Sequence, residues 1–314
     1  MTPYQGSRQR PGAAGLLVVV LLWAGLGPPA AAAPLQVVTT LPDLAALARE
    51  VGGDRIKATS LAKGTEDPHF VDARPSFVRV LNQADLLVEV GAELELGWLP
   101  VLVNTARNPR IQGDAPGHLV AARGIRLLGV AAGPVDRSAG DVHPGGNPHY
   151  HLDPANGRLI AGSLAAALTR LDPAGDAVYQ ANLRRFQERL DGRLAEWTRT
   201  LAPLRGTKVL TYHRSFDYLL ERFGLELVGT IEPKPGIEPT PTHINALLPK
   251  AKEAGVKLVL VEPNRPRRTA QRVADGIGAR LVVLPIMVNG AEPATDYLKL
   301  FDYIVQQLGD AAKP

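Results

Sequence analysis

The stretch that decides the fold runs from Asp172 to Leu201 and reads DPAGDAVYQANLRRFQERLDGRLAEWTRTL. Large apolar side chains recur in it at intervals of three or four residues, which is the period of one face of an α-helix. They are Tyr179, Leu183, Phe186, Leu190, Leu194, Trp197 and Leu201. An Asp-Pro pair opens the stretch in the order typical of a helix start. The spacing predicts one helix of about 29 residues, roughly 43 Å long at 1.5 Å per residue.

Short apolar runs lie on both sides of this helix, in two sets. They are nearly continuous in apolar residues, as expected of parallel strands that are covered on both faces. The runs are Leu35–Leu41, Arg55–Leu61, Ala84–Val90, Gly124–Val130, Lys208–Tyr212, Leu225–Ile231, Val256–Val261 and Ala279–Pro285. Amphipathic segments separate them. The first of these has apolar residues at helical spacing from Leu44 onward and stops at Gly52 and Gly53.

Strands that alternate with helices indicate an α/β protein. We therefore predict two βα lobes, each with a four-stranded, mainly parallel sheet, joined by one long rigid connecting helix. In this prediction residues 33–171 form the N-terminal lobe, residues 172–203 the connecting helix and residues 204–314 the C-terminal lobe. A helix that spans both lobes should limit their relative motion.

Residues 1–32 have the composition of a secretory signal peptide. Arg8 and Arg10 supply positive charge, residues 13–26 are apolar, and Ala30–Ala32 offers a small-residue cleavage site. The apolar run is too short for a comfortable bilayer span, which takes about 20 residues. Cysteine is absent, which excludes disulfides and a lipid-modified cysteine. We expect a protein that is exported to a periplasm and is free in it.

The charge balance does not favour nucleic acid as a partner. The formal net charge is +4 and the pI is about 9.4. However, the basic residues are interspersed with acidic ones and form no block with interleaved aromatic residues. We expect a monomer that does not bind nucleic acid.

Three histidines occur in separate short loops, in the strings EDPH at 66–69, NPH at 147–149 and TYH at 211–213. His69 and His149 follow prolines, which fix the local backbone, and His213 directly follows a predicted strand. In open parallel sheets, ligands collect beyond the carboxyl ends of the strands. Neutral imidazole is the commonest metal-binding side chain, and three of them are the usual beginning of a zinc site. We therefore predict that His69, His149 and His213 bind one metal ion between the two lobes.

At these residues the chain resembles the metal-binding solute receptors of zinc and manganese ABC transporters, of the zinc-receptor type. The matching strings are Glu66–His69 with Pro75 and Ser76, Asn147–Pro154, Thr211–Phe216 and Val261–Pro263. The resemblance extends over the chain after the signal segment and includes the long helix. It implies a periplasmic receptor, not an enzyme, that binds Zn²⁺ and delivers it to an ABC permease in the inner membrane. It also implies that the three histidines take the positions of the family's histidine ligands, and it allows for a periplasmic metallochaperone as a second partner.

The fourth ligand departs from the family pattern. The family usually has an aspartate in the loop after the last strand, whereas residues 283–290 read VLPIMVNG and contain no carboxylate. Glu262 directly follows a predicted strand, and we expect its carboxylate to complete the site. Asp296 or a water molecule is the alternative. The second departure is His151, at a position where the family commonly has tryptophan.

The remaining histidines and nearby charged residues are given other roles. His151 alternates with His149, so it is expected to point away and pack behind it. His143 lies in a Gly/Pro-rich loop, residues 135–147, which we expect to be mobile and to become ordered on loading. Whether His143 briefly captures metal and passes it on stays open. Residues expected at solvated positions or helix starts are His118, His243, Glu66 and Asp67. Residues expected to orient ligands through hydrogen bonds are Arg214, Asp217 and Glu232.

The ligand types decide which metal and which rival functions to consider. Three imidazoles and one carboxylate suit zinc, whereas manganese prefers more oxygen ligands; Mn²⁺, copper and nickel stay open as alternatives. An exported zinc-dependent hydrolase is the main competing function, with Glu262 as general base. Against it, the chain has no His-Glu-x-x-His motif. A receptor for a small organic solute, with incidental histidines, is the third alternative.

Overall fold

The strands of the part of the chain that the structure describes form two four-stranded sheets, and every pairing within them is parallel. The structure is a computed structural model that describes residues 1–4, 6, 33–133, 140 and 142–313. The expected signal peptide lies almost entirely outside these residues, as do residues 135–139 and 141 of the loop expected to be mobile. Among the helices of the described ranges, none is long and apolar enough to cross a membrane.

The first sheet has the strand order β2-β1-β3-β4. Its strands are β1 (Leu35–Thr39), β2 (Ile56–Ser60), β3 (Leu86–Glu89) and β4 (His118–Val120). The helices of this first half of the chain are α1 (Pro42–Gly52), α2 (Pro75–Gln83), α3 (Leu99–Ala106) and α4 (Pro154–Leu171). α1 buries the apolar face predicted from Leu44 onward and ends at Gly52. The capping residue Gly53 has a φ of 53°, which suits a residue without a Cβ atom.

The fourth strand of this sheet is not the one predicted. Gly124–Val130 forms turns and irregular backbone, and His118–Val120 pairs with β3 instead. The predicted segment is apolar, but Gly124 and Gly129 have φ of 83° and 65°, outside the extended region that a strand requires. The actual strand is only three residues long, begins with a histidine and is only partly buried, so it lacks the pattern of a buried strand.

The second sheet repeats the same arrangement, in the order β6-β5-β7-β8. Its strands are β5 (Lys208–Thr211), β6 (Glu226–Thr230), β7 (Leu258–Val261) and β8 (Arg280–Val283), all within the predicted runs. The helices of this second half are α6 (Asp217–Phe223), α7 (Pro241–Ala254), α8 (Arg267–Ile277) and α9 (Tyr297–Ala311). In each sheet the chain reverses its direction of strand addition after the second strand. This creates a switch point between β1 and β3, and another between β5 and β7, where ligands commonly bind.

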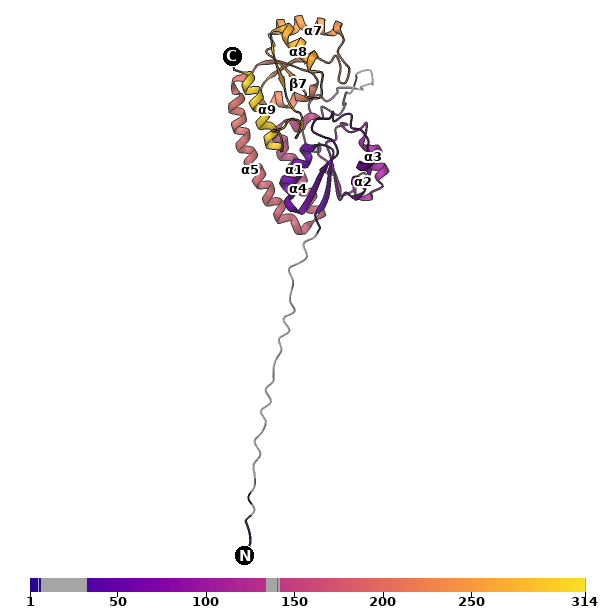
Figure 1. The fold of residues 1–314 in the computed structure, drawn as a ribbon, viewed down its shortest axis with the longest axis vertical. Coiled ribbons are helices and arrows are strands. Elements are labelled where there is room, and N and C mark those ends of the chain that lie inside the picture. Colours follow the sequence, from indigo (N-terminus) through magenta and orange to yellow (C-terminus); the bar gives the residue numbers. More distant parts are fainter. Residues whose placement is uncertain (5, 7–32, 134–139, 141, 314) are drawn as a thin grey trace. The chain divides into compact units, whose positions relative to one another are not determined.

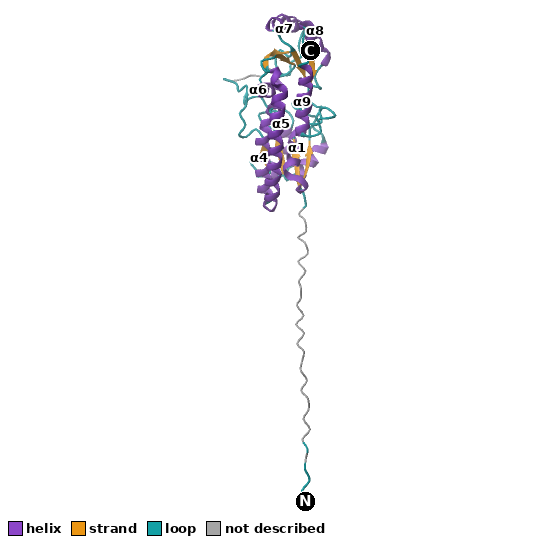
Figure 2. Ribbon diagram, turned by 90° about the vertical axis from the view of Figure 1, so that its left-hand side faces the viewer, coloured by secondary structure: helices purple, strands orange, loops and turns teal. Residues whose placement is uncertain are grey.

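The predicted long helix is α5 (Asp176–Leu201), with 26 residues, which corresponds to about 39 Å. It is shorter than expected because 3₁₀ turns, Pro173–Gly175 and Ala202–Leu204, occupy its two ends. α5 packs against α1 and α4 of the first half and against α9 of the second half (Figures 1 and 2). A single helix therefore contacts both halves of the chain, as the apolar repeat predicts.

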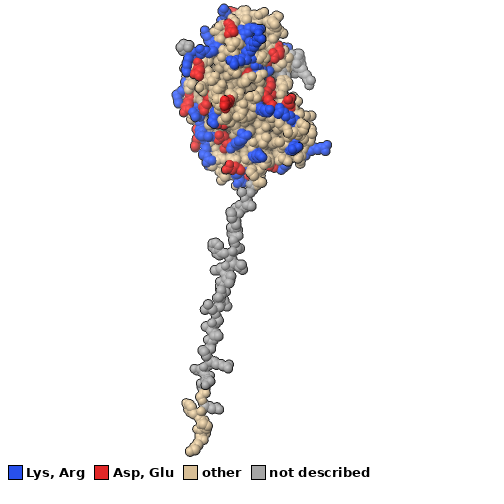
Figure 3. All heavy atoms as spheres, viewed as in Figure 1, with Lys and Arg blue, Asp and Glu red and all other residues tan. Residues whose placement is uncertain are grey.

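One hydrophobic core extends through both halves. It contains residues of β1 and α1 as well as residues of α9, and residues Pro34–Pro314 form one compact unit. A smaller core lies between the other face of the second sheet and the helices α7 and α8. On the face shown in Figure 3, basic and acidic side chains are interspersed, in line with the sequence. The lobe boundaries at 171/172 and 203/204 stay a prediction.

Candidate metal centre

Three loops carry the predicted histidines to one place. His69 lies in the loop between β2 and α2, His149 begins the 3₁₀ turn that precedes α4, and His213 directly follows β5. Their ring centroids are 5.1 to 5.4 Å apart, and one ligand atom from each lies within 4.8 Å of the other two. All three side chains are buried. The structure therefore brings His69, His149 and His213 together as the sequence predicts.

Asn147 supports this arrangement from the loop before His149. Its side-chain oxygen accepts a hydrogen bond from the His149 backbone N–H at 2.9 Å. Its side-chain nitrogen donates to the carbonyl oxygen of Arg214 at 2.8 Å. Arg214 directly follows His213, so one amide side chain connects the His149 loop of the first half to the His213 loop of the second half.

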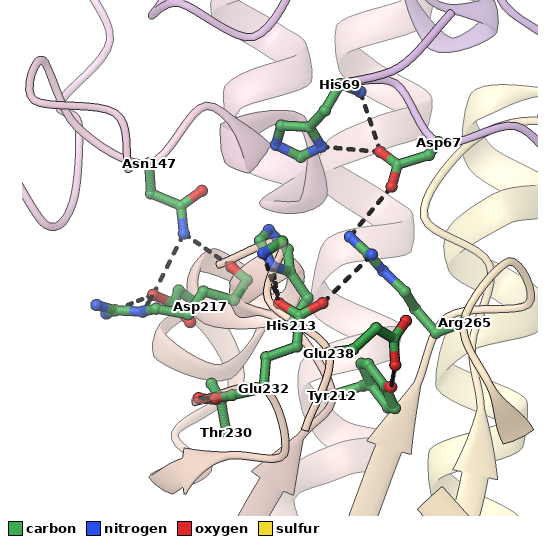
Figure 4. A network of polar contacts seen from close by, with 12 residues as sticks. Asp67, His69, Asn147, Tyr212, His213, Asp217, Thr230, Glu232, Glu238 and Arg265 are labelled. Carbon is green, nitrogen blue, oxygen red and sulfur yellow. Dashed lines mark hydrogen bonds and ion pairs between the residues drawn. The ribbon is translucent and has the colours of Figure 1, made fainter. Parts of the chain in front are cut away.

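Two of the histidines are oriented by carboxylates (Figure 4). His69 Nδ1 lies 2.9 Å from Asp67 Oδ1, and His213 Nδ1 lies 2.8 Å from Glu232 Oε2. A carboxylate oxygen accepts, so the proton belongs on Nδ1, and Nε2 is left with a free lone pair for a metal. His69 Nε2 is buried without a hydrogen-bond partner among the described residues, as are both ring nitrogens of His149.

The electrostatics keep these groups in the states that metal binding needs. Burial, with smaller effects from neighbouring histidines, lowers the pKa of His149 well below its ordinary value, which favours the neutral imidazole. Burial alone would raise the pKa of Asp67, but the hydrogen bonds and charge of His69 together with the charge of Arg265 outweigh it and bring the pKa to about 2. Asp67 is therefore an ionised acceptor at neutral pH.

The carboxylates take partly different roles from those expected. Asp67, expected to face solvent or cap a helix, orients His69, whereas Glu232 orients His213 as predicted. Arg214 and Asp217 pair with each other at 2.7 Å, and in the described chain neither is hydrogen-bonded to a histidine ring. Asp217 Oδ2 accepts a hydrogen bond from the Asn147 side chain at 3.3 Å. Glu66 pairs with Arg74.

Glu262 lies at the carboxyl end of β7, next to the switch point. It is 1% exposed, and neither of its carboxylate oxygens forms a hydrogen bond of regular geometry among the described residues, although the Ser215 hydroxyl is near enough to lower its pKa. Burial raises its pKa, while the charge of His213 acts in the opposite direction. Glu262 is not part of the group of ligand atoms within 4.8 Å of one another, which in the described chain consists of the three histidines. Asp296, the alternative, caps α9 by accepting from the Lys299 backbone N–H.

The other histidines lie around or outside this group. His143 stacks on His69 with ring centroids 5.3 Å apart, and burial, together with His69 and His213, lowers its pKa to about 4. His151 is fully buried and bonds through Nε2 to the Ile286 carbonyl oxygen at 3.1 Å, which fits its predicted packing role. His118 lies elsewhere, bonded to Gly113 and Glu89.

Arg265 is the residue that the sequence analysis missed. Its guanidinium lies 3.1 Å from Asp67 Oδ2 and 3.3 Å from Glu232 Oε1, and so contacts both orienting carboxylates. Its position in the sequence could have pointed to a role in the site. Arg265 comes three residues after Glu262, in the loop beyond β7, where a side chain can reach the switch point.

A small pocket opens onto the site. Its volume is about 180 Å³ and its lining includes His143, His149, His213 and Arg214. Sites for organic ligands are commonly about 300–1,000 Å³. The pocket therefore suits an ion and its path of entry better than a drug-sized organic solute.

Comparison with known proteins agrees with this geometry. The family model described as ZnuA, zinc-uptake complex component A, periplasmic, matches residues 37–311. The chain belongs to this family. It is a metal-binding solute-binding protein of ABC transporters, as the histidine strings indicate. The family is one of receptors rather than enzymes, its members are exported, and they work with a membrane permease.

Relatives in this family are named for two different metals. The high-affinity zinc uptake protein ZnuA of Paracoccus denitrificans is 27% identical, and the alignment covers 90% of this chain and 93% of that protein. The manganese substrate-binding lipoprotein PsaA of Streptococcus pneumoniae is also 27% identical, covering 84% of each. Sequence similarity therefore establishes a metal receptor, and the choice of metal depends on the ligands.

Solved structures share the fold. A crystal structure of ZnuA has a TM-score of 0.73 at 23% identity and covers 89% of this chain and 100% of that one. The cadmium-bound periplasmic metal-binding protein of Candidatus Liberibacter asiaticus has a TM-score of 0.74 at 20% identity, covering 88% and 99%. At these identities the likeness concerns the fold, two parallel sheets with a long helix between them.

Proposed function

We propose that this protein is a periplasmic, high-affinity zinc receptor that delivers Zn²⁺ to an ABC permease of the inner membrane. The observation that carries the proposal is the cluster of three buried imidazoles, two of which present Nε2 because a carboxylate holds Nδ1. An all-nitrogen cluster suits zinc, whereas Mn²⁺ prefers sites richer in oxygen ligands.

Glu262 is proposed as the fourth ligand. Its support is a buried carboxylate without an ion-pair partner in the described structure, directly after β7, the strand adjacent to the one that His213 follows. Burying an unpaired carboxylate is costly, and a divalent cation nearby offsets that cost. The side chain has to move toward the histidines on loading, because it lies outside their 4.8 Å group.

The setting of the receptor follows from the same proposal. Residues 1–32 are a cleaved signal peptide, and the mature chain acts as a free monomer whose lobes, 33–171 and 204–314, are joined by the helix at 172–203. A metallochaperone that hands over zinc is a second partner. Against a zinc hydrolase, the pocket beside the histidines is small, about 180 Å³.

Metal analysis of the protein purified without chelators tests the proposal, followed by competition titrations with Zn²⁺ and Mn²⁺. We expect stoichiometric zinc and a strong preference for zinc. His69→Ala, His149→Ala and His213→Ala should each weaken zinc binding by more than the roughly 10–100-fold that loss of an outer partner costs. His118→Ala is the matched control and should bind as the wild type does.

Two results would count against the zinc assignment. Equal or tighter binding of Mn²⁺ would make this a receptor for another metal. A protein that binds no divalent metal tightly, with the three variants indistinguishable from the control, would remove the metal site altogether.

A further inference from the structure

One arginine connects the two histidine–carboxylate pairs. The two terminal nitrogens of Arg265 lie 3.1 Å from Asp67 Oδ2 and 3.3 Å from Glu232 Oε1. The second oxygen of each carboxylate holds Nδ1 of a histidine, His69 on one side and His213 on the other. The result is a continuous chain of contacts from one imidazole through the guanidinium to the other imidazole (Figure 4).

This network draws on distant parts of the chain. Asp67 follows β2 of the first sheet, Glu232 follows β6 of the second sheet, and Arg265 follows β7. The guanidinium side chain is 14% exposed and the Glu232 side chain 4% exposed. Because water has little access, these ion pairs are less screened than pairs at the surface.

Both carboxylates are also fixed by backbone donors. The His69 backbone N–H donates to Asp67 Oδ1 at 3.0 Å, and the Gly236 backbone N–H donates to Glu232 Oε2 at 3.2 Å. The arginine holds the remaining oxygen of each carboxylate. With both oxygens engaged, neither carboxylate can rotate without losing a contact.

We propose that Arg265 is a positioning residue for the metal site, which fixes the tautomer and direction of His69 and His213 by holding their carboxylate partners. The inference rests on the proposed function, because it takes these histidines as ligands. Arginine suits the task because its planar fork presents separate N–H groups to two acceptors, whereas lysine offers a single nitrogen. Loss of the guanidinium releases one oxygen of each carboxylate. Among the described residues, each carboxylate is then held only by its backbone donor and the imidazole itself, so it fixes the direction of the ring less firmly.

The test compares Arg265→Gln and Arg265→Lys with a matched control, Arg222→Gln. Arg222 also joins the two halves, because it pairs with Asp153 at 2.6 to 2.7 Å, but no contact links it to the three histidine rings in the described structure. Two readouts are needed. Long-range ¹H–¹⁵N spectra of the metal-free proteins report the histidine tautomers, and competition titrations report the zinc dissociation constants.

In the wild type and in Arg222→Gln we expect His69 and His213 as single Nδ1–H tautomers with equal zinc affinity, even if the control is less stable. Arg265→Gln should show mixed tautomers and a zinc dissociation constant about 10–100-fold higher, in the range known for outer partners of metal ligands. Arg265→Lys should fall between them. If the glutamine variant does not fold, the lysine variant carries the same comparison.

Tautomers and affinity that match the Arg222→Gln control in both Arg265 variants would overturn the inference. Lost affinity with unchanged tautomers would overturn it as well, because the arginine would then act by another route. The tautomers are read without metal, so the role of Arg265 can be decided even if zinc binding, and with it the proposed function, fails.

Discussion

At the scale of single residues, Glu262 is the clearest case of a side chain whose surroundings demand an explanation. The Glu262 side chain is 1% exposed and forms no ion pair among the described residues, and burial raises its pKa against the Ser215 hydroxyl and its own backbone N–H. An ionised carboxylate at this place destabilises the metal-free fold. The proposed explanation is that an ion is the missing partner. Stability without metal and affinity for metal should then respond to this residue in opposite directions.

Glu262→Gln tests that relation. Removing the buried charge should raise the unfolding free energy of the metal-free protein by about 1–2 kcal/mol and weaken zinc binding by at least about 10-fold. Thermal unfolding without metal and a zinc competition titration measure the two effects. Glu66→Gln, at a carboxylate paired with Arg74, is the control and should leave zinc affinity unchanged. Unaltered affinity in Glu262→Gln would leave water as the fourth ligand.

At the scale of secondary structure elements, the contact between α4 and α9 holds the His149 turn against the second half. The Tyr297 hydroxyl donates to the His151 carbonyl oxygen at 3.0 Å, and its ring packs against Phe186 and Phe301. This close approach is possible because α4 carries Gly157 at the crossing. A Cβ atom at that position would lie 2.4 Å from the tyrosine ring.

Gly157→Ala should therefore destabilise the protein by about 1–3 kcal/mol, because the buried ring has no room to move aside. Gly162→Ala is the matched control in the same helix, where an added Cβ meets nothing within 4 Å. There the better helix propensity of alanine should stabilise the protein by up to about 1 kcal/mol. Urea unfolding midpoints distinguish the two variants, and equal midpoints would contradict the crossing as the cause.

At the scale of the whole molecule, Asp43 links the first helix to the last loop. Its Oδ2 accepts a hydrogen bond from the Val288 backbone N–H at 3.1 Å, across 245 positions of sequence. Burial raises the pKa of Asp43 from 3.8 to about 7, although the Val288 hydrogen bond opposes the shift. Between roughly pH 4 and 7 the folded protein thus binds more protons than the unfolded chain, and its stability falls as pH rises through this range.

Asp43→Asn keeps an acceptor for Val288 and removes the ionisation. From pH 5 to pH 8 the wild type loses stability as Asp43 ionises, and the variant does not. The unfolding free energy of the variant minus that of the wild type should therefore increase by about 2–3 kcal/mol over this range. Urea unfolding of both proteins at the two pH values measures this difference. Glu95 is another buried carboxyl group with a pKa of about 7. Because it is present in both proteins, its effect on stability cancels in the difference between the variant and the wild type. A difference that does not change with pH would mean that Asp43 is already ionised in the folded protein at pH 5.

The parts of this fold that follow from local pattern were predictable from the sequence. The α5 repeat and the second set of strands depend on which residues are apolar and at what spacing, and these are properties of a short window. The prediction of a strand at Gly124–Val130 was wrong because the apolar residues of this segment occur together with glycines that have positive φ. The true edge strand, His118–Val120, exists because β3 offers it an unpaired edge, and such an edge is not visible in a local pattern.

The candidate site divides in the same way. The short sequence strings around His69, His149 and His213 were enough to predict these three residues as metal ligands, because the residue type and its neighbours in the sequence are local information. What holds those rings was decided by tertiary structure, which placed Asp67, Glu232 and Arg265 beside one another from loops after three different strands. Asp67 stands two residues before His69, so that contact is local. Glu232 and Arg265 meet their partners only when folding brings distant segments together, because Coulombic and hydrogen-bond energies depend on distance in space.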